Sequence, residues 1–178
     1  FKNWTAAGYA ALADHAADKG FQVYLCGGPA RLERDLAAEI QRLSQSKPED
    51  LVGQTSLKQL LALIGEASLV LAPDTGPAHM ATLVGTPVIG LYAHHNPART
   101  GPYLCRDYLV SVYQELIEQE TGKPLAELGW RTRLKDPDAM AKISRERVIA
   151  AFDRLCTDKH LLPTQGNSEI PSPGAGII

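Results

Sequence analysis

Three short, mostly apolar runs recur along this chain, and the segments between them have the spacing of amphipathic helices. The runs cover residues 21–26, 69–72 and 88–92. None of them alternates apolar with polar residues, as a strand with one face in water would. Strands buried on both faces and separated by helices are typical of parallel sheets with crossover helices. The sequence therefore predicts an α/β fold, a Rossmann-like parallel sheet with helices on both faces.

Helix-start residues mark where the helices between these runs begin. Thr5 and Ser144 each stand directly before a stretch of helical periodicity, where a hydroxyl can cap the first turn. Ser56 and Gln59 have the spacing of a capping box. A weaker apolar run over residues 108–112 predicts one further strand.

The length of 178 residues fits one domain, which we place at residues 1–157. Gly, Pro and Ser dominate from about residue 163, so residues 158–178 are expected to form a disordered tail. The first residue is Phe1 rather than Met, and the opening residues do not read as a signal peptide. We therefore expect a fragment of a longer protein, with its natural N-terminus upstream.

Charge and cysteine content exclude several partner classes. The formal net charge of −2 provides no global attraction to nucleic acid or to an anionic membrane, so no nucleic-acid partner is expected. No apolar run approaches the roughly 18 residues that span a bilayer. The three cysteines are few and widely spaced, which favours buried, reduced thiols in the cytoplasm.

The segment after the apolar run at residues 69–72 carries most of the chemical information. It reads as a strand, a tight turn and a helix start, and ligands bind beyond the carboxyl ends of parallel strands. Free N–H groups and the helix dipole at such a start make an anion site, for which a phosphate or diphosphate is the expected guest. Its candidate phosphate-binding residues are Thr75, Gly76, Pro77 and Ala78, with His79 as a further donor.

Asp74 does not suit a phosphate neighbour, because a carboxylate repels it. Beside a nucleotide-sugar it is better placed to hold sugar hydroxyls. The alternative is that Asp74 and Thr75 only cap the helix while His79 packs in the core.

A second candidate site follows the first apolar run. Gly27 and Gly28 break that run, and Glu33 comes within the first turns of the next helix. A carboxylate in this position commonly accepts hydrogen bonds from two ribose hydroxyls. The glycine spacing does not match the dinucleotide fingerprint, so an ordinary NAD site is disfavoured. The alternative for Glu33 is a helix-start charge that interacts with the dipole.

Two further regions contain candidate site residues: the first residues of the chain and the loop after the apolar run at residues 88–92. Lys2 is a candidate contact for a phosphate, and Trp4 is expected to pack. The loop over residues 93–103 follows a buried strand, and His94, Asn96 and Arg99 are its candidates for contact with an acceptor. His94 and His95 suggest a metal pair, but no third ligand has suitable spacing, so no metal site is expected.

Several motifs occur together in a fixed order and resemble the C-terminal half of glycosyltransferase family 9, the lipopolysaccharide heptosyltransferases. They are Lys2-Asn3-Trp4, Gly27-Gly28-Pro29 with Glu33, Val52-Gly53-Gln54-Thr55-Ser56-Leu57, Asp74-Thr75-Gly76-Pro77-Ala78-His79, Gly85-Thr86-Pro87-Val88-Ile89 and Gly101-Pro102-Tyr103.

The resemblance implies the donor-binding domain of a GT-B enzyme, in which two Rossmann-like domains face each other. Such enzymes transfer heptose from ADP-heptose to the lipopolysaccharide core at the cytoplasmic face of the inner membrane, with inversion and without a metal or other cofactor. The acceptor domain and the catalytic base would then lie outside this chain, with peripheral membrane association. By position, Lys2 would contact the diphosphate and Glu33 the ribose. The other implied contacts are Gly53, Thr55 and Ser56 near the base, Asp74 at the sugar hydroxyls, and Thr75, Gly76 and His79 at the phosphates.

The sequence departs from this family in three places. Members usually have a Phe-Gly-Pro-Thr-like run where this chain has Tyr92-Ala93-His94-His95-Asn96, and residues 114–138 form a longer segment than expected. The strand that should precede Lys2 is missing, so the sheet is expected to lack one member.

Three alternatives remain open from sequence. The first is another nucleotide-sugar enzyme with a GT-B fold, or an epimerase. The second is a non-catalytic Rossmann-like binding module. The third is a haloacid-dehalogenase-type phosphatase, which is disfavoured because Gly76 stands where its second aspartate belongs.

Overall fold

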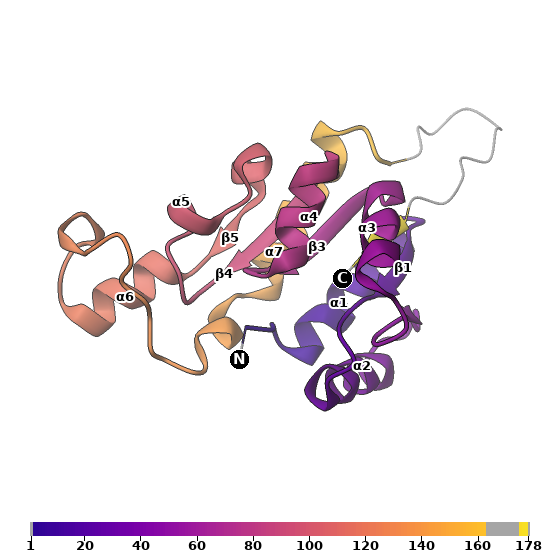
Figure 1. The fold of residues 1–178 in the computed structure, drawn as a ribbon, viewed down its shortest axis with the longest axis horizontal. Coiled ribbons are helices and arrows are strands. Elements are labelled where there is room, and N and C mark those ends of the chain that lie inside the picture. The colour runs from indigo at the N-terminus through magenta and orange to yellow at the C-terminus, as the bar shows by residue number, and fades with distance from the viewer. Residues whose placement is uncertain (1, 163–174, 178) are drawn as a thin grey trace.

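The computed structural model describes residues 2–162 and 175–177, and its centre is one six-stranded parallel sheet (Figure 1). The strand order is β2-β1-β6-β3-β4-β5, and every neighbouring pair is parallel. This confirms the predicted α/β fold. The strands are β1 (Gln22–Leu25), β2 (Glu49–Asp50), β3 (Leu69–Pro73), β4 (Val88–Tyr92), β5 (Val110–Ser111) and β6 (Ala175–Ile177).

Helices cover both faces of this sheet. In Figure 1, α3 and α4 pack side by side in front of the strands, whereas α1 and α7 lie behind them. The α-helices are α1 (Ala6–Asp18), α2 (Arg31–Leu43), α3 (Leu57–Glu66), α4 (Gly76–Val84), α5 (Pro97–Thr100), α6 (Tyr113–Thr121) and α7 (Arg145–Asp158). Three 3-10 helices are η1 (Tyr103–Tyr108), η2 (Leu125–Glu127) and η3 (Ala139–Lys142).

The predicted helix caps are present. The Thr5 hydroxyl accepts from the backbone N–H of Gly8, and the Ser144 hydroxyl accepts from that of Arg147. Ser56 and Gln59 form the complete capping box at the start of α3. These bonds satisfy N–H groups that have no partner inside the helix, which is why each helix begins at that residue.

The core is centred on β3 and β4, whose residues are all buried. A strand with helices on both faces has no solvent side, so it contains no polar alternation. Trp4 is packed in the core as predicted: it is 3% exposed, and its indole Nε1 donates to the Ile143 carbonyl at 2.9 Å.

We expected the sheet to lack one strand, the one that should precede Lys2, but the structure has an unpredicted strand between β1 and β3. Residues 175–177 form β6 there, paired with β1 on one side and β3 on the other. The predicted disordered tail over residues 158–178 is therefore wrong for residues 175–177, while residues 163–174 lie outside the described part. The strand predicted over residues 108–112 is shorter, because η1 takes the chain up to Tyr108.

The polar segment that follows β5 packs against the loop after β4. The Tyr113 hydroxyl donates to the Thr132 carbonyl at 2.7 Å, and the Leu134 N–H donates to the His94 carbonyl at 3.0 Å. Arg133 forms a single antiparallel bridge with His95. The longer segment is thus part of this domain, and it holds the loop after β4 in place.

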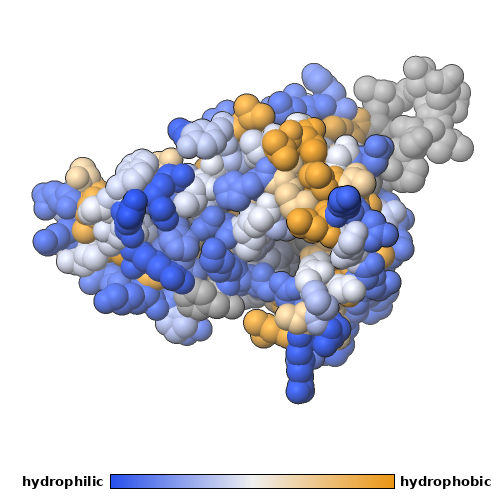
Figure 2. Space-filling view, in the orientation of Figure 1, coloured by the Kyte–Doolittle hydropathy of each residue, from blue (hydrophilic) through white to orange (hydrophobic). Residues whose placement is uncertain are grey.

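One stretch of the surface is apolar. Figure 2 shows hydrophobic side chains gathered over α3 and α4, while most of the rest of this view is hydrophilic. Leu57, Leu83 and Val84 are the exposed large apolar residues of these two helices. Among the described residues, no helix is both long and apolar enough to cross a membrane.

Candidate functional site

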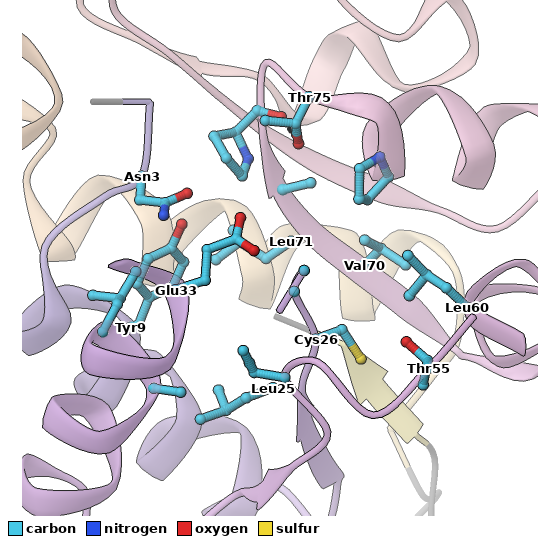
Figure 3. Close-up of a pocket in the computed structure, with 18 of the residues that line it drawn as sticks. Asn3, Tyr9, Leu25, Cys26, Glu33, Thr55, Leu60, Val70, Leu71 and Thr75 are labelled. Carbon is cyan, nitrogen blue, oxygen red and sulfur yellow. Dashed lines mark hydrogen bonds between the residues drawn. The ribbon is translucent and has the colours of Figure 1, made fainter. Parts of the chain in front are cut away.

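A cavity of about 340 Å³ opens at the carboxyl ends of β1 and β3 (Figure 3). This volume is within the range of small-molecule sites. Polar lining residues come from four different segments: Asn3, Glu33, Thr55 with Ser56, and Thr75. Its apolar walls include Leu25, Ile40, Val52, Leu60, Val70 and Leu71.

Glu33 is the only carboxylate among the residues that line this cavity. Figure 3 shows its side chain projecting from α2 into the space, with Asn3 on one side and Thr75 beyond. The turn at Gly27 and Gly28 makes room for it: a Cβ on Gly28 would lie 2.8 Å from the Glu33 Oε2. Glycine at this turn therefore permits the carboxylate to sit directly above the end of β1.

The three residues predicted near the base divide into two kinds. Thr55 and Ser56 line the cavity, as a direct contact requires. Gly53 is not part of the lining; it has a φ of +73°, and its N–H donates to the Gly27 carbonyl at 2.9 Å. Gly53 thus supports the glycine turn beneath the cavity, in a conformation that favours glycine.

The helix start after β3 agrees with the prediction in position and differs in two details. Thr75 is the N-cap residue of α4, but its hydroxyl donates to the Pro73 carbonyl at 3.2 Å and does not cap the helix. The Ala78 N–H bonds to the Thr75 carbonyl at 3.2 Å. The expectation that this N–H is free for a phosphate is therefore wrong, because the first helical turn already uses it.

The remaining residues of this turn are open to a ligand. Thr75 and Pro77 line the cavity, and Gly76 is exposed, with no Cβ contact within 4 Å. His79 is exposed on α4, so the alternative in which it packs in the core is wrong.

Beside the cavity, three charged or titratable side chains meet in what we call the Lys2–Asp74–His95 cluster. The Lys2 Nζ donates to the backbone carbonyl of Asp74 at 2.9 Å and lies 3.8 Å from its Oδ2. That same Oδ2 is 2.7 Å from the His95 Nδ1. The Asp74 and His95 side chains are only 15% and 16% exposed. The cluster spans the ends of β3 and β4.

The pKa of His95 is lowered: burial is the largest influence and lowers it, whereas the hydrogen bond and charge of Asp74 raise it. The positive charges of Lys2 and Arg133 lower the pKa further. The imidazole is therefore neutral at neutral pH, and its proton sits on Nδ1 because a carboxylate can only accept.

The other loop residues have structural contacts. His94 is 3% exposed, with Nδ1 3.4 Å from the Leu134 carbonyl. Asn96 is 8% exposed and caps α5 by accepting from the Ala98 N–H at 2.9 Å. Arg99 is half-buried, and its Nε has no hydrogen-bond partner within the described chain. Of the predicted acceptor contacts, His94 and Asn96 are too buried for that role.

Sequence reasoning missed His95 as a member of the site. His94 and His95 are adjacent, and neighbouring residues of an extended segment point in opposite directions. The pattern could therefore indicate that one of them faces the site, but not which one. The pairing partner Asp74 is 21 residues away, and only the parallel pairing of β3 with β4 brings the two together.

The part of this site that the structure describes contains neither a metal cluster nor a reactive thiol. Among residues 2–162 and 175–177, no group of three or more His, Cys, Asp or Glu side chains could hold a metal ion. Cys26 lines the cavity, but burial and the charge of Asp50 raise the pKa of its thiol to about 11. The arrangement instead suits binding: an apolar hollow, a carboxylate for hydroxyls, and a cation beside a helix start.

Comparison with known proteins gives relatives of one kind. Over 154 residues the chain is 47% identical to the lipopolysaccharide core heptosyltransferase OpsX of Haemophilus influenzae, covering 86% of this chain and 44% of that protein. Lipopolysaccharide heptosyltransferase 3 of Escherichia coli K12 is 37% identical over 93 residues, or 52% of this chain and 27% of that protein. The chain thus spans less than half the length of these relatives.

A solved structure and a family model agree with these relatives. The glycosyl transferase family 9 protein of Veillonella parvula superposes with a TM-score of 0.66 at 25% identity, over 88% of this chain and 43% of that one. The model of glycosyltransferase family 9 (heptosyltransferase) matches residues 1–143. The chain therefore belongs to glycosyltransferase family 9.

Proposed function

We propose that this chain is the donor-binding domain of an inverting, metal-independent glycosyltransferase that moves a heptose from ADP-heptose to the lipopolysaccharide core. The observation that carries the proposal is the position of Glu33. It projects into an apolar cavity whose far rim is Thr75 at the start of α4, next to Lys2. This order of groups matches a ribose, a diphosphate and a sugar laid across the sheet end.

Each part of the donor has a partner with suitable chemistry. The apolar walls and the Thr55 and Ser56 hydroxyls would enclose the base. Glu33 would accept hydrogen bonds from the ribose hydroxyls. The diphosphate would lie between the Lys2 ammonium and the start of α4, where the helix dipole favours negative charge.

The chemistry assigned to this domain is stabilisation of the leaving group. The acceptor oxygen forms a bond to the sugar C1, the C1–O bond to the diphosphate breaks, and the electron pair remains on the phosphate oxygen. A base on the acceptor domain takes the hydroxyl proton. Lys2 and the helix start would stabilise the growing negative charge, which needs fixed donors rather than a nucleophile.

The proposed acceptor also suggests where the enzyme works. Relatives are named for the lipopolysaccharide core, so we propose action at the cytoplasmic face of the inner membrane with peripheral attachment. The exposed apolar side chains Leu57, Leu83 and Val84 support such attachment, because apolar side chains enter the interface of a bilayer favourably.

Calorimetric titration of the chain with ADP, UDP, GDP and NAD, with and without magnesium, tests the proposal. We expect ADP to bind without magnesium and the variants Glu33→Ala and Thr75→Ala to bind it more weakly. A preference for UDP or GDP would keep the nucleotide-sugar site and change the donor. If neither the chain nor the full-length protein bound any of the four, a non-catalytic module would be the better explanation.

A further inference from the structure

Asp74 and His95 form a pair with the geometry of an oriented imidazole. The Asp74 Oδ2 and the His95 Nδ1 are 2.7 Å apart, and both side chains are largely buried. Because the carboxylate accepts the Nδ1 proton, the ring is fixed in the tautomer whose Nε2 carries a lone pair. No hydrogen bond of Nε2 is found within residues 2–162 and 175–177. The Nδ1 of the ring is thus bonded to Asp74, and its Nε2 is available to a ligand.

The loop that carries His95 is held on both sides, so the ring needs little reorganisation to meet a ligand. The Tyr92 hydroxyl donates to the Thr100 carbonyl at 3.1 Å, which closes the loop from within. The bridge to Arg133 holds it from the side of the following segment. A preorganised side chain loses less entropy on binding than a mobile one.

The position of the pair indicates which part of a ligand it meets. Asp74 directly precedes Thr75, and Lys2 contacts both the carbonyl and the carboxylate of Asp74. A diphosphate held by Lys2 and the start of α4 would put the transferred group next to His95. The imidazole is neutral there, because its pKa is lowered. Burial and the positive charges of Lys2 and Arg133 lower this pKa, and Asp74 raises it. A neutral imidazole provides no charge for a phosphate, but it accepts a hydrogen bond from a hydroxyl.

We propose that the Nε2 of His95 accepts a hydrogen bond from a hydroxyl of the transferred sugar, and that Asp74 holds the imidazole for this contact. The inference rests on the proposed donor site and names the residue that recognises its sugar end. It also changes the role of Asp74, because one of its oxygens is already bonded to His95. His95 then contributes to the choice of sugar, and Asp74 acts partly as a positioning residue.

Two substitutions of His95 distinguish the contribution of its Nδ1 from that of its Nε2. His95→Asn keeps a donor near the Nδ1 position and removes the acceptor at Nε2. His95→Gln extends an amide oxygen towards the Nε2 position. The matched control is His15→Asn, because His15 forms a similar 2.7 Å pair with Asp153 between α1 and α7. Binding of ADP and of ADP-heptose would be measured by calorimetry for each full-length variant, with the kcat and KM for transfer.

For His95→Asn we expect about a tenfold loss of ADP-heptose affinity, as for one lost hydrogen bond to a sugar, with ADP affinity unchanged within twofold. His95→Gln should recover part of the loss, and His15→Asn should change neither affinity. An equal loss for both ligands, or none for ADP-heptose, would overturn the inference and leave the donor site intact. A wild-type enzyme that binds neither ligand would overturn the proposed function, and this inference with it.

Discussion

The two sides of strand β3 present different surfaces at its carboxyl end. Towards β1 lies the cavity, whose walls are mostly apolar and whose lining includes one carboxylate, Glu33. Towards β4 lies the Lys2–Asp74–His95 cluster, in which each side chain already contacts another. The first surface is a space to be filled, and the second is a set of polar groups fixed in place.

This difference suggests a division of labour across one strand. Apolar walls gain free energy from whatever flat group they enclose, so the cavity side is suited to affinity for the nucleotide. Polar groups that are bonded to one another have their directions set before a ligand arrives, so the cluster is suited to orienting the reacting sugar. Substitutions on the two sides should therefore affect different measurements.

The largest effect is expected for Asp74→Ala in the full-length enzyme. The substitution removes the bonding partner of His95 and the carboxylate beside Lys2, so the sugar end of the donor is no longer oriented. We expect kcat/KM for transfer to fall by about a hundredfold, which is about 2.7 kcal/mol of transition-state stabilisation. Steady-state kinetics with ADP-heptose would measure it, and ADP affinity should change by less than about threefold.

The control for Asp74→Ala is Asp153→Ala, which breaks the remote pair with His15. Both substitutions remove a carboxylate 2.7 Å from an imidazole nitrogen, but Asp153 lies on α7 behind the sheet. Its loss should leave kcat/KM within about twofold. Normal turnover in Asp74→Ala would show that the Lys2–Asp74–His95 cluster does not orient the sugar.

The next effect is expected on the cavity side, for Glu33→Gln. The amide keeps the size of the side chain but replaces a charged acceptor by a neutral one, and hydrogen bonds to charged groups are the stronger kind. We expect ADP to bind about tenfold more weakly by calorimetry. The same substitution at Glu39, which lies further along α2 and pairs with Arg42, should have no effect. An unchanged ADP affinity in Glu33→Gln would mean that this carboxylate does not hold the ribose.

The sequence indicated the cavity side more completely than the charged side, for a physical reason. Glu33 follows the glycine turn at Gly27 and Gly28 within a few residues, so a local pattern places it at the strand end. The Asp74–His95 pair instead depends on the pairing of β3 with β4, which a local pattern does not specify. Local reasoning named Asp74 and chose His94, whose side chain is buried beside Leu134.

The fold shows the same limit of local patterns. Buried strands and helix caps such as Ser56 with Gln59 are local features, and the structure contains them as predicted. Strand β6 was missed, because residues 175–177 follow a stretch rich in Gly, Pro and Ser. Its place between β1 and β3 is determined by long-range pairing.

A smaller effect on the cavity side is expected for Gly28→Ala. The new Cβ would lie 2.8 Å from the Glu33 Oε2, so the flexible carboxylate must move aside. We expect about a threefold loss of ADP affinity, less than for Glu33→Gln because the charge remains. The control Gly65→Ala adds a methyl group where nothing lies within 4 Å. It should leave binding unchanged and raise stability by about 0.5–1 kcal/mol, since alanine favours a helix interior. A loss larger than that of Glu33→Gln would show that Gly28 itself approaches the ligand.

The last prediction concerns Asp14, a carboxylate that belongs neither to the cavity nor to the Lys2–Asp74–His95 cluster. Asp14 on α1 accepts hydrogen bonds from the Ser44 hydroxyl at 2.6 Å and from the backbone N–H groups of Gln45 and Ser46, at the end of α2. Burial alone would raise the pKa of Asp14, but these hydrogen bonds outweigh it and lower the pKa to about 2. The charged form is therefore bound more favourably in the folded chain than in the unfolded one.

Because the folded pKa lies below the unfolded value of about 3.9, Asp14 stabilises the fold above about pH 4 and loses this effect as the pH falls towards 2. We expect Asp14→Asn to lower the free energy of unfolding by about 1–2 kcal/mol at pH 7, after allowance for partial exposure, and by progressively less in acid. Urea unfolding at several pH values measures this, with the exposed Asp18→Asn on the same helix as control. ADP affinity should stay unchanged in both variants. A stability difference that stayed constant from pH 7 to pH 2 would show that Asp14 acts through packing rather than through its charge.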